Sequence, residues 1–187
     1  MTAPPSVTGA IAFTDIAGFT AFCEAAGDEA AVTALEAQSR VVAGVLPADA
    51  RLVKELGDGL MLWFPAAAEA VATCVELQRR LAGALSAGEF PLWVRVGLHH
   101  GPAVARGDDL VGHHVNVAAR IVDLAGAREV LCSEAARDAA GEVPGVEFVA
   151  VGPAPAKGVA EPVWLYRAEA VTVSVDARGP GAGPPPR

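Results

Sequence analysis

Cysteine, basic charge and long apolar runs are all scarce in this chain of 187 residues. The three cysteines, Cys23, Cys74 and Cys132, are widely spaced and form no C-x-x-C pair. This favours buried thiols in a reducing cytoplasm over a disulfide framework or a zinc site. The formal net charge of -8 argues against a nucleic-acid surface, because phosphate backbones need a basic face. Any anionic ligand must therefore meet locally placed cations.

Long hydrophobic segments are missing, although 52% of the residues are hydrophobic, a fraction that alanine inflates. No apolar run reaches the roughly 20 residues of a membrane span, and no basic-then-apolar signal peptide opens the chain. We therefore expect a cytoplasmic protein with no membrane span and no nucleic-acid partner.

The length suits one domain that is large enough to bury a full core. We expect residues 1–7 to form a flexible leader and residues 8–170 to form the folded domain. Residues 171–187 are rich in Gly and Pro, a composition that cannot pack a core. We therefore expect a disordered tail there.

Hydrophobic periodicity divides the domain into helices and strands. Helical spacing predicts helices over 19–26, 28–46, 66–86 and 114–125. Apolar runs bounded by turn residues predict strands over 9–15, 52–56, 60–64, 92–98, 128–132, 146–151 and 163–168. This order predicts an α+β fold with a ferredoxin-like split βαβ core, in which a mostly antiparallel sheet carries helices packed on one face.

Two aspartates fall where apolar strands end. Asp15 precedes a turn at Gly18, so its carboxylate could hold a cation against a phosphate or simply cap the next helix. Asp58 lies in the hairpin turn Gly57-Asp58-Gly59, where Asp is also common for structural reasons. A central hairpin beside the first strand would bring Asp58 near Asp15, and two converging carboxylates repel each other unless a cation lies between them. Magnesium prefers such a pair, completed by phosphate and water.

Four further polar residues stand in places where a structural explanation is also available. Lys54 interrupts an apolar strand and could reach solvent from a sheet edge. Arg95 interrupts another apolar strand, Asp109 lies in a polar loop, and Lys157 precedes a glycine between prolines. Each of these residues alone is weak evidence for a site.

The helix over 114–125 has one polar face. Asn116 and Arg120 are four residues apart and share this face, which we expect to lie away from buried Val117, Ile121 and Leu124. The face is free to meet a ligand, although a solvated Asn–Arg pair explains it equally well.

Taken together, these segments resemble the class III nucleotidyl cyclase catalytic domain. They follow the family's order across residues 8–168: Phe13-Thr14-Asp15-Ile16-Ala17-Gly18-Phe19-Thr20, Lys54-Glu55-Leu56-Gly57-Asp58, Arg95-Val96-Gly97-Leu98-His99-His100-Gly101, Val115-Asn116-Val117-Ala118-Ala119-Arg120 and Lys157-Gly158. The resemblance implies a lyase that produces cyclic nucleotides for signal transduction.

At the phosphate end of the substrate, the resemblance implies a site for two divalent ions, Mg2+ or Mn2+. Asp15 and Asp58 would hold these ions, with the Ile16 carbonyl as a further ligand. Arg95 and Lys157 would bind the β- and γ-phosphates.

At the nucleoside end, the resemblance implies that Lys54 and Asp109 read the base. Asn116 would orient the ribose, and Arg120 would stabilise charge on the α-phosphate in the transition state. Adenine offers an N1 acceptor and an N6 donor, which a Lys donor and an Asp acceptor complement, whereas guanine reverses that edge. We therefore expect an adenylyl cyclase that binds ATP and releases 3′,5′-cyclic AMP and pyrophosphate, with a guanylyl cyclase or a catalytically silent nucleotide-binding or dimerisation module as alternatives.

Sites in this family lie between two catalytic domains. One domain contributes the metal-binding aspartates and Arg95, and the other contributes the base, ribose and transition-state residues with Lys157. Since this chain carries both sets, the resemblance implies a head-to-tail homodimer with two equivalent active sites.

The four histidines form two adjacent pairs, His99-His100 and His113-His114. Adjacent residues on a strand point to opposite faces, so neither pair chelates a metal well. For His113 and His114 we expect a packing or loop role.

Overall fold

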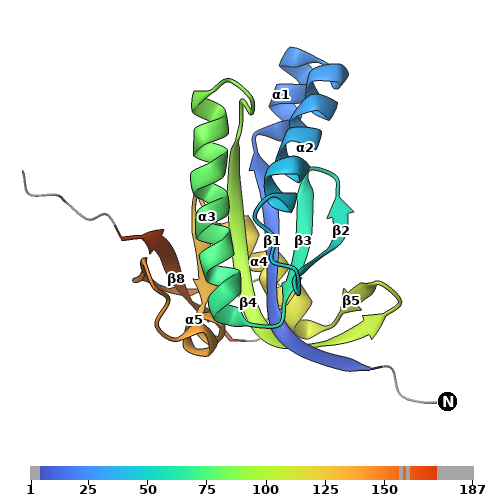
Figure 1. The fold of residues 1–187 in the computed structure, drawn as a ribbon. Coiled ribbons are helices and arrows are strands. Elements are labelled where there is room, and N and C mark those ends of the chain that lie inside the picture. Colours follow the sequence, from blue (N-terminus) through green and yellow to red (C-terminus); the bar gives the residue numbers. More distant parts are fainter. Residues whose placement is uncertain (1–4, 156–157, 159–160, 172–187) are drawn as a thin grey trace, which may run out of the picture.

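The computed structural model describes residues 5–155, 158 and 161–171. One sheet runs through the domain in the order β2-β3-β1-β4-β6-β8-β7, with β5 paired to β4 beside this path (Figure 1). The strands are β1 (Ser6–Ala17), β2 (Arg51–Leu56), β3 (Gly59–Phe64), β4 (Trp93–Arg106), β5 (Asp109–Val111), β6 (Val130–Ser133), β7 (Val146–Ala154) and β8 (Val163–Ala170). The helices are α1 (Phe19–Ala26), α2 (Asp28–Ala43), α3 (Ala67–Ser86), α4 (His113–Leu124) and α5 (Glu134–Ala140).

The first part of the chain confirms the predicted α+β fold with a split βαβ core. Strands β4, β1, β3 and β2 are neighbours in that order, and the α1–α2 and α3 segments connect them. Neighbouring strands in the sheet pair antiparallel except β4 and β6, which are parallel.

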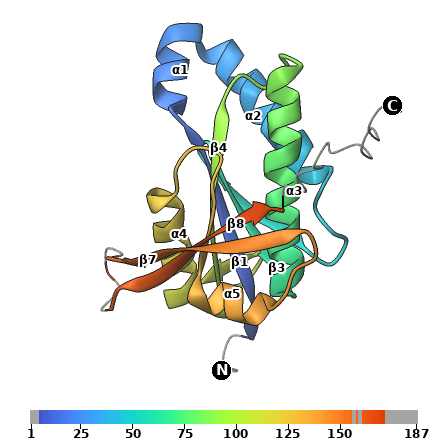
Figure 2. The same cartoon turned by 90° about the vertical axis from the view of Figure 1, so that its left-hand side faces the viewer.

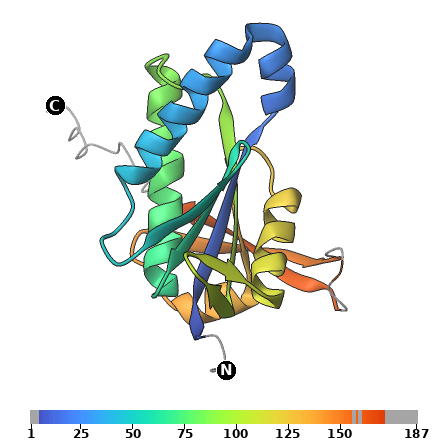
Figure 3. The same ribbon diagram turned by 90° about the vertical axis from the view of Figure 1, so that its right-hand side faces the viewer.

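Helices cover both faces of the sheet, which differs from the expected single face. Ala10 and Ala12 of β1 pack into the core that α2 and α3 cover, whereas Ile11 and Phe13 pack into a second cluster with α4. Figures 2 and 3 show α3 and α4 on opposite sides of the strands. The physical reason is the unbroken apolar run of β1, which leaves no polar side for solvent.

Long-range pairing extends some elements beyond their local patterns. β1 begins at Ser6, inside the segment expected to be a leader, because Ser6 lies opposite Val104 of β4. The same ladder extends β4 to Arg106. α2 ends at Ala43, before Pro47, and β5 and α5 are elements that the sequence pattern did not predict. Apart from Val171, the expected tail lies outside the described residues.

Helix α4 lies directly on the backbone of β4. A Cβ atom at Gly97 would be 2.1 Å from the backbone nitrogen of Val122, and one at Gly101 would be 2.4 Å from Nδ1 of His114. Only glycine permits such close approach, so these two positions fix the height of α4 above the sheet.

Burial of the thiols agrees with their expected role as core residues. Cys74 and Cys132 are buried and Cys23 is partly buried, and burial raises the pKa of the Cys74 thiol to about 12. Among the helices of the described ranges, none is both long enough and apolar enough for a membrane crossing.

Candidate active site

The predicted site residues on β1, β2 and β4 lie on the sheet face that carries α4. Side chains alternate along a strand, so Asp15 shares the side of Ile11 and Phe13, which pack under α4. Arg95 is the direct cross-strand partner of Asp15, and Lys54 lies opposite Met61, a member of the same cluster. The strand pairing therefore gathers these polar side chains around one helix.

An ion pair joins the ends of β1 and β4. Arg95 Nε donates to Asp15 Oδ2 at 2.7 Å, and both side chains are about 30% exposed. Arg95 Nη1 also donates to the backbone oxygen of Asp123, at 3.3 Å. The candidate phosphate-binding arginine is therefore engaged by a candidate metal ligand in this structure.

The hairpin that carries Asp58 is fastened to β1 by Thr14. The backbone nitrogen of Leu60 donates to Thr14 Oγ1 at 3.1 Å, and Gln38 Nε2 donates to the same oxygen. Gly59 lies against the Thr14 carbonyl, where a Cβ would be only 2.7 Å away. The sequence reasoning did not single out Thr14 or Gly59, whose role depends on the β1–β3 register.

The two aspartates are close enough to interact electrostatically. Burial raises the pKa of the Asp58 carboxyl above its ordinary value, and the neighbouring Asp15 charge raises it further. Backbone amides of Asp58 and Ile16 and the Arg95 charge act in the opposite direction without cancelling the increase. The site thus carries negative charge that a cation would relieve.

The donor set fits hard divalent ions. The described ranges contain no group of three or more His, Cys, Asp or Glu side chains placed to hold a metal. Two carboxylates and the Ile16 carbonyl would leave further positions for phosphate and water, as Mg2+ prefers. The oxygen-only set is also a poor match for zinc in a structural site.

A second ion pair joins Lys54 of β2 to Asp109 of β5. Lys54 Nζ lies 2.7 Å from Asp109 Oδ1 and 2.9 Å from Oδ2, with side chains 33% and 39% exposed. The hydrogen bond from Lys54 lowers the pKa of the Asp109 carboxyl. Asp109 is the first residue of β5, opposite Arg106, whereas the sequence pattern placed it in a loop.

Helix α4 presents Asn116 and Arg120 on its exposed side and buries Val117 and Ile121, as expected. The prediction for Leu124 was wrong, because this side chain is 43% exposed where the helix ends. The chain turns inward one residue later, so Ala125 fills the buried position.

Asp123 is a site neighbour that sequence reasoning missed. Arg120 Nη1 lies 3.3 Å from Asp123 Oδ2, while the Asp123 carbonyl accepts from Arg95. Asp123 therefore contacts both described arginines of the site. A signal was available in the three-residue spacing from Arg120, which places the two side chains on one helical face.

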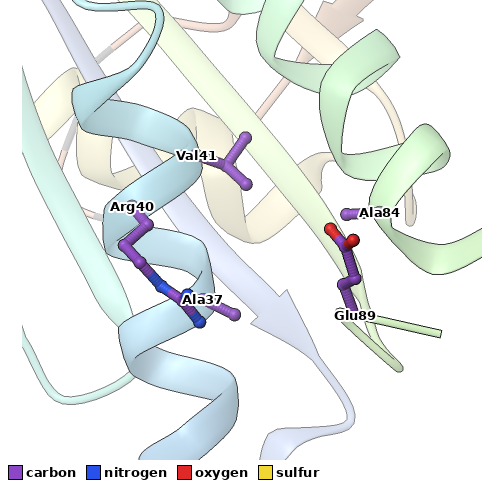
Figure 4. A pocket seen from close by; sticks show the side chains of 5 residues that line it. All are labelled: Ala37, Arg40, Val41, Ala84 and Glu89. Atoms are coloured by element: carbon purple, nitrogen blue, oxygen red, sulfur yellow. The ribbon is translucent and has the colours of Figure 1, made fainter. Parts of the chain in front are cut away.

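Lys157 lies outside the described residues. A separate cavity of about 460 Å³ opens between α2 and α3, lined by Ala37, Arg40, Val41, Ala84 and Glu89 (Figure 4). Ala37 and Ala84 belong to the core on the α2–α3 face, so this cavity lies on the other side of the sheet from Asp15. We assign it no part in the site.

Sequence comparisons match most of this chain to known proteins. The model of the adenylate and guanylate cyclase catalytic domain matches residues 2–169. An uncharacterized protein of Mycobacterium tuberculosis (strain H37Rv) is 35% identical over 163 residues, which cover 86% of this chain and 41% of that protein. A pH-sensitive adenylate cyclase of M. tuberculosis (strain CDC 1551) is 29% identical over 160 residues, covering 84% of this chain and 39% of that protein.

The fold also matches a solved structure. The crystal structure of the adenylyl cyclase CyaB from P. aeruginosa has a TM-score of 0.80 at 21% identity, and the match covers 92% of this chain and 98% of that chain. This likeness shows the fold. The chain spans about two fifths of the length of the curated relatives described above.

Proposed function

This chain belongs to the family of adenylate and guanylate cyclase catalytic domains, and we propose that it is an adenylyl cyclase. It would convert ATP to 3′,5′-cyclic AMP and pyrophosphate. The observation that carries the choice of ATP is the Lys54–Asp109 ion pair, which holds one donor and one acceptor side by side. That pair complements the N1 acceptor and the N6 donor of adenine.

Asp15, Asp58 and the Ile16 carbonyl are the residues we propose as ligands of two divalent ions, Mg2+ or Mn2+. When bound, such ions lower the pKa of the attacking 3′-hydroxyl and offset charge on the phosphoryl oxygens. The raised pKa of Asp58 supports this assignment, because it results from burial and from the neighbouring Asp15 charge, both of which a bound cation would offset. The family's use of divalent ions points the same way.

The protein's own groups act by orientation and charge. We assign Asn116 to the ribose, which it would hold so that the 3′-hydroxyl faces the α-phosphorus. Arg120 would stabilise the charge that grows on the α-phosphate in the transition state. Arg95, with Lys157, would bind the β- and γ-phosphates. Asp123 contacts both Arg95 and Arg120. Each arginine would therefore exchange its contact with Asp123 for a phosphate oxygen when it binds substrate.

We propose that two copies of the chain share each active site in a head-to-tail homodimer. Asn116 and Arg120 stand on the exposed side of α4, where they can reach a nucleotide held by a second copy. Both halves of the residue set are encoded in one chain, so a closed dimer would contain two equivalent sites.

Two alternatives remain distinguishable by experiment. A guanylyl cyclase would need the Lys54–Asp109 pair to accept the reversed edge of guanine. A silent nucleotide-binding or dimerisation module is disfavoured because each described catalytic position carries the functional residue type.

The test is a product assay with purified protein, supplied in parallel with ATP or GTP and with Mg2+ or Mn2+. We expect cyclic AMP as the main product, and none from Asp58→Asn, which keeps the shape of the side chain but removes its charge. Cyclic GMP as the main product would overturn the base assignment. If neither cyclic nucleotide forms while ATP still binds, the chain is a silent module.

A further inference from the structure

A series of hydrogen bonds, one buried and one partly buried, joins β4, α4 and the start of α5. His99 on β4 is 7% exposed, and its Nε2 lies 2.8 Å from Nδ1 of His114 on α4. Its other nitrogen, Nδ1, lies 2.7 Å from the Oγ of Ser133, which is 1% exposed. The His99 and His114 rings are stacked, with centroids 5.1 Å apart and planes inclined by 10°.

One direction of proton donation gives both hydrogen bonds, Ser133–His99 and His99–His114, a donor and an acceptor. Ser133 Oγ accepts from the backbone nitrogen of Ala136 as the N-cap of α5, which leaves its hydroxyl proton for His99 Nδ1. His99 then carries its proton on Nε2 and donates to His114 Nδ1. This assignment is inferred from the network, and it requires both imidazoles to be neutral.

The first turn of α4 begins without a side-chain cap. The N-cap residue, Gly112, makes no side-chain cap hydrogen bond, and the first turn holds no acidic residue. His114 instead lies between His99 and the bare Cα of Gly101, where a Cβ would be 2.4 Å from its Nδ1. The imidazole therefore lies between the helix start and the sheet, in contact with both.

We propose that His114 is a positioning residue for catalysis: its hydrogen bond to His99 fixes the first turn of α4 and so sets Asn116, two residues later, at the ribose. This inference rests on the proposed function. It assigns a task to His99 and His114, which the cyclase resemblance leaves without one, and it explains why the two rings stack between β4 and α4.

The protonation state of the network supports this role. Burial, together with the neighbouring imidazoles of His114, His100 and His113, lowers the pKa of His99 to about 4. Burial also lowers the pKa of His114, with His113 and His100 adding to the effect. These imidazoles are the titratable groups that act on the pair, from both α4 and β4. At neutral pH the hydrogen bond between His99 and His114 is therefore intact.

The test compares three variants. His114→Leu keeps bulk but removes the hydrogen bond, His114→Asn keeps a polar atom at the Nδ1 position, and His113→Leu is a matched control at the neighbouring exposed imidazole. We expect His114→Leu to lower kcat for ATP by about tenfold with little change in KM, because a displacement of about 1 Å costs up to about 10²-fold. His114→Asn and His113→Leu are expected to stay within about twofold of the parent.

A second measurement separates this proposal from the proposed function. Hydrogen exchange of the α4 amides requires no activity, and we expect faster exchange in the first turn of His114→Leu than in the parent or His113→Leu. A folded His114→Leu with parental kcat and parental exchange would overturn the proposal, as would an equal loss in His114→Asn. If His114→Leu does not fold, the kcat values of His114→Asn and His114→Gln test the proposal instead. Gln reaches beyond the Nδ1 position, so we expect His114→Gln to lose activity while His114→Asn keeps it, and equal kcat values would overturn the proposal. An inactive parent with faster α4 exchange in His114→Leu would reject the cyclase and keep the anchoring of the helix.

Discussion

Acid should destabilise this protein through one buried imidazole. The pKa of His99 is about 4 in the folded protein and 6.5 is its ordinary value, so the unfolded chain binds the proton more tightly. The stabilisation that depends on neutral His99 is thus complete above about pH 6.5 and is lost progressively as the pH falls toward about 4. With 1.36 kcal/mol for each pKa unit, lowering the pH from about 7 to about 5 should cost on the order of 2 kcal/mol.

Urea unfolding of the parent and of His99→Asn at these two pH values isolates this contribution. Asn keeps a polar atom near Ser133 and cannot titrate, so the carboxylates contribute equally to both proteins. We expect the parent to lose about 2 kcal/mol more than His99→Asn between the two pH values. Equal losses in the two proteins would refute the reasoning, because His99 would then titrate alike in the folded and unfolded states.

Three further predictions concern the sheet, a strained loop and the shared site. Gly97→Ala should lower the free energy of unfolding by about 1–3 kcal/mol, because the added Cβ lies 2.1 Å from the Val122 nitrogen; parental stability in urea would contradict this packing. Arg128 has a φ of 70°, a conformation that favours glycine. In thermal unfolding we therefore expect the Arg128→Gly variant to be more stable than Arg128→Ala by about 1 kcal/mol, and equal melting temperatures would contradict the strain at this position. Asp15→Ala and Arg120→Ala should each be inactive, and mixing them one to one should restore about a quarter of parental activity, since half of the dimers then hold one intact site; no recovery in verified mixed dimers would argue against sharing.

Local patterns were sufficient for most of the fold. The helix predicted over 19–26 coincides with α1, and the hairpin at Gly57-Asp58-Gly59 connects β2 and β3 as predicted. β5 has three residues, too few for any period, and it exists because Asp109 pairs back onto Arg106. α5 has seven residues and four alanines, so it shows no amphipathic repeat and forms where Ser133 caps it.

The site residues are proposed from residue type and motif order, and only some of their contacts could be predicted from the sequence. Asp58 near Asp15 followed from a hairpin beside the first strand, and the electrostatic influence of Asp15 on Asp58 agrees with that expectation. The Arg95–Asp15 ion pair depends on the register of β1 against β4, and the hydrogen bond from Arg95 to the Asp123 carbonyl depends on how α4 packs on β4. Both are long-range outcomes of packing that no window of sequence contains.

The Lys54–Asp109 pair has a consequence for how this fold can diversify. Both side chains are about one third exposed and stand at the rim of the sheet, on β2 and β5. An ion pair in such surroundings contributes at most about 1 kcal/mol to stability. Replacing it therefore leaves the core and the contacts of Gly97 and Gly101 with α4 unchanged. Under the proposed function, purine preference and thermodynamic stability are therefore encoded in separate parts of the chain, and selection can change one while leaving the other in place.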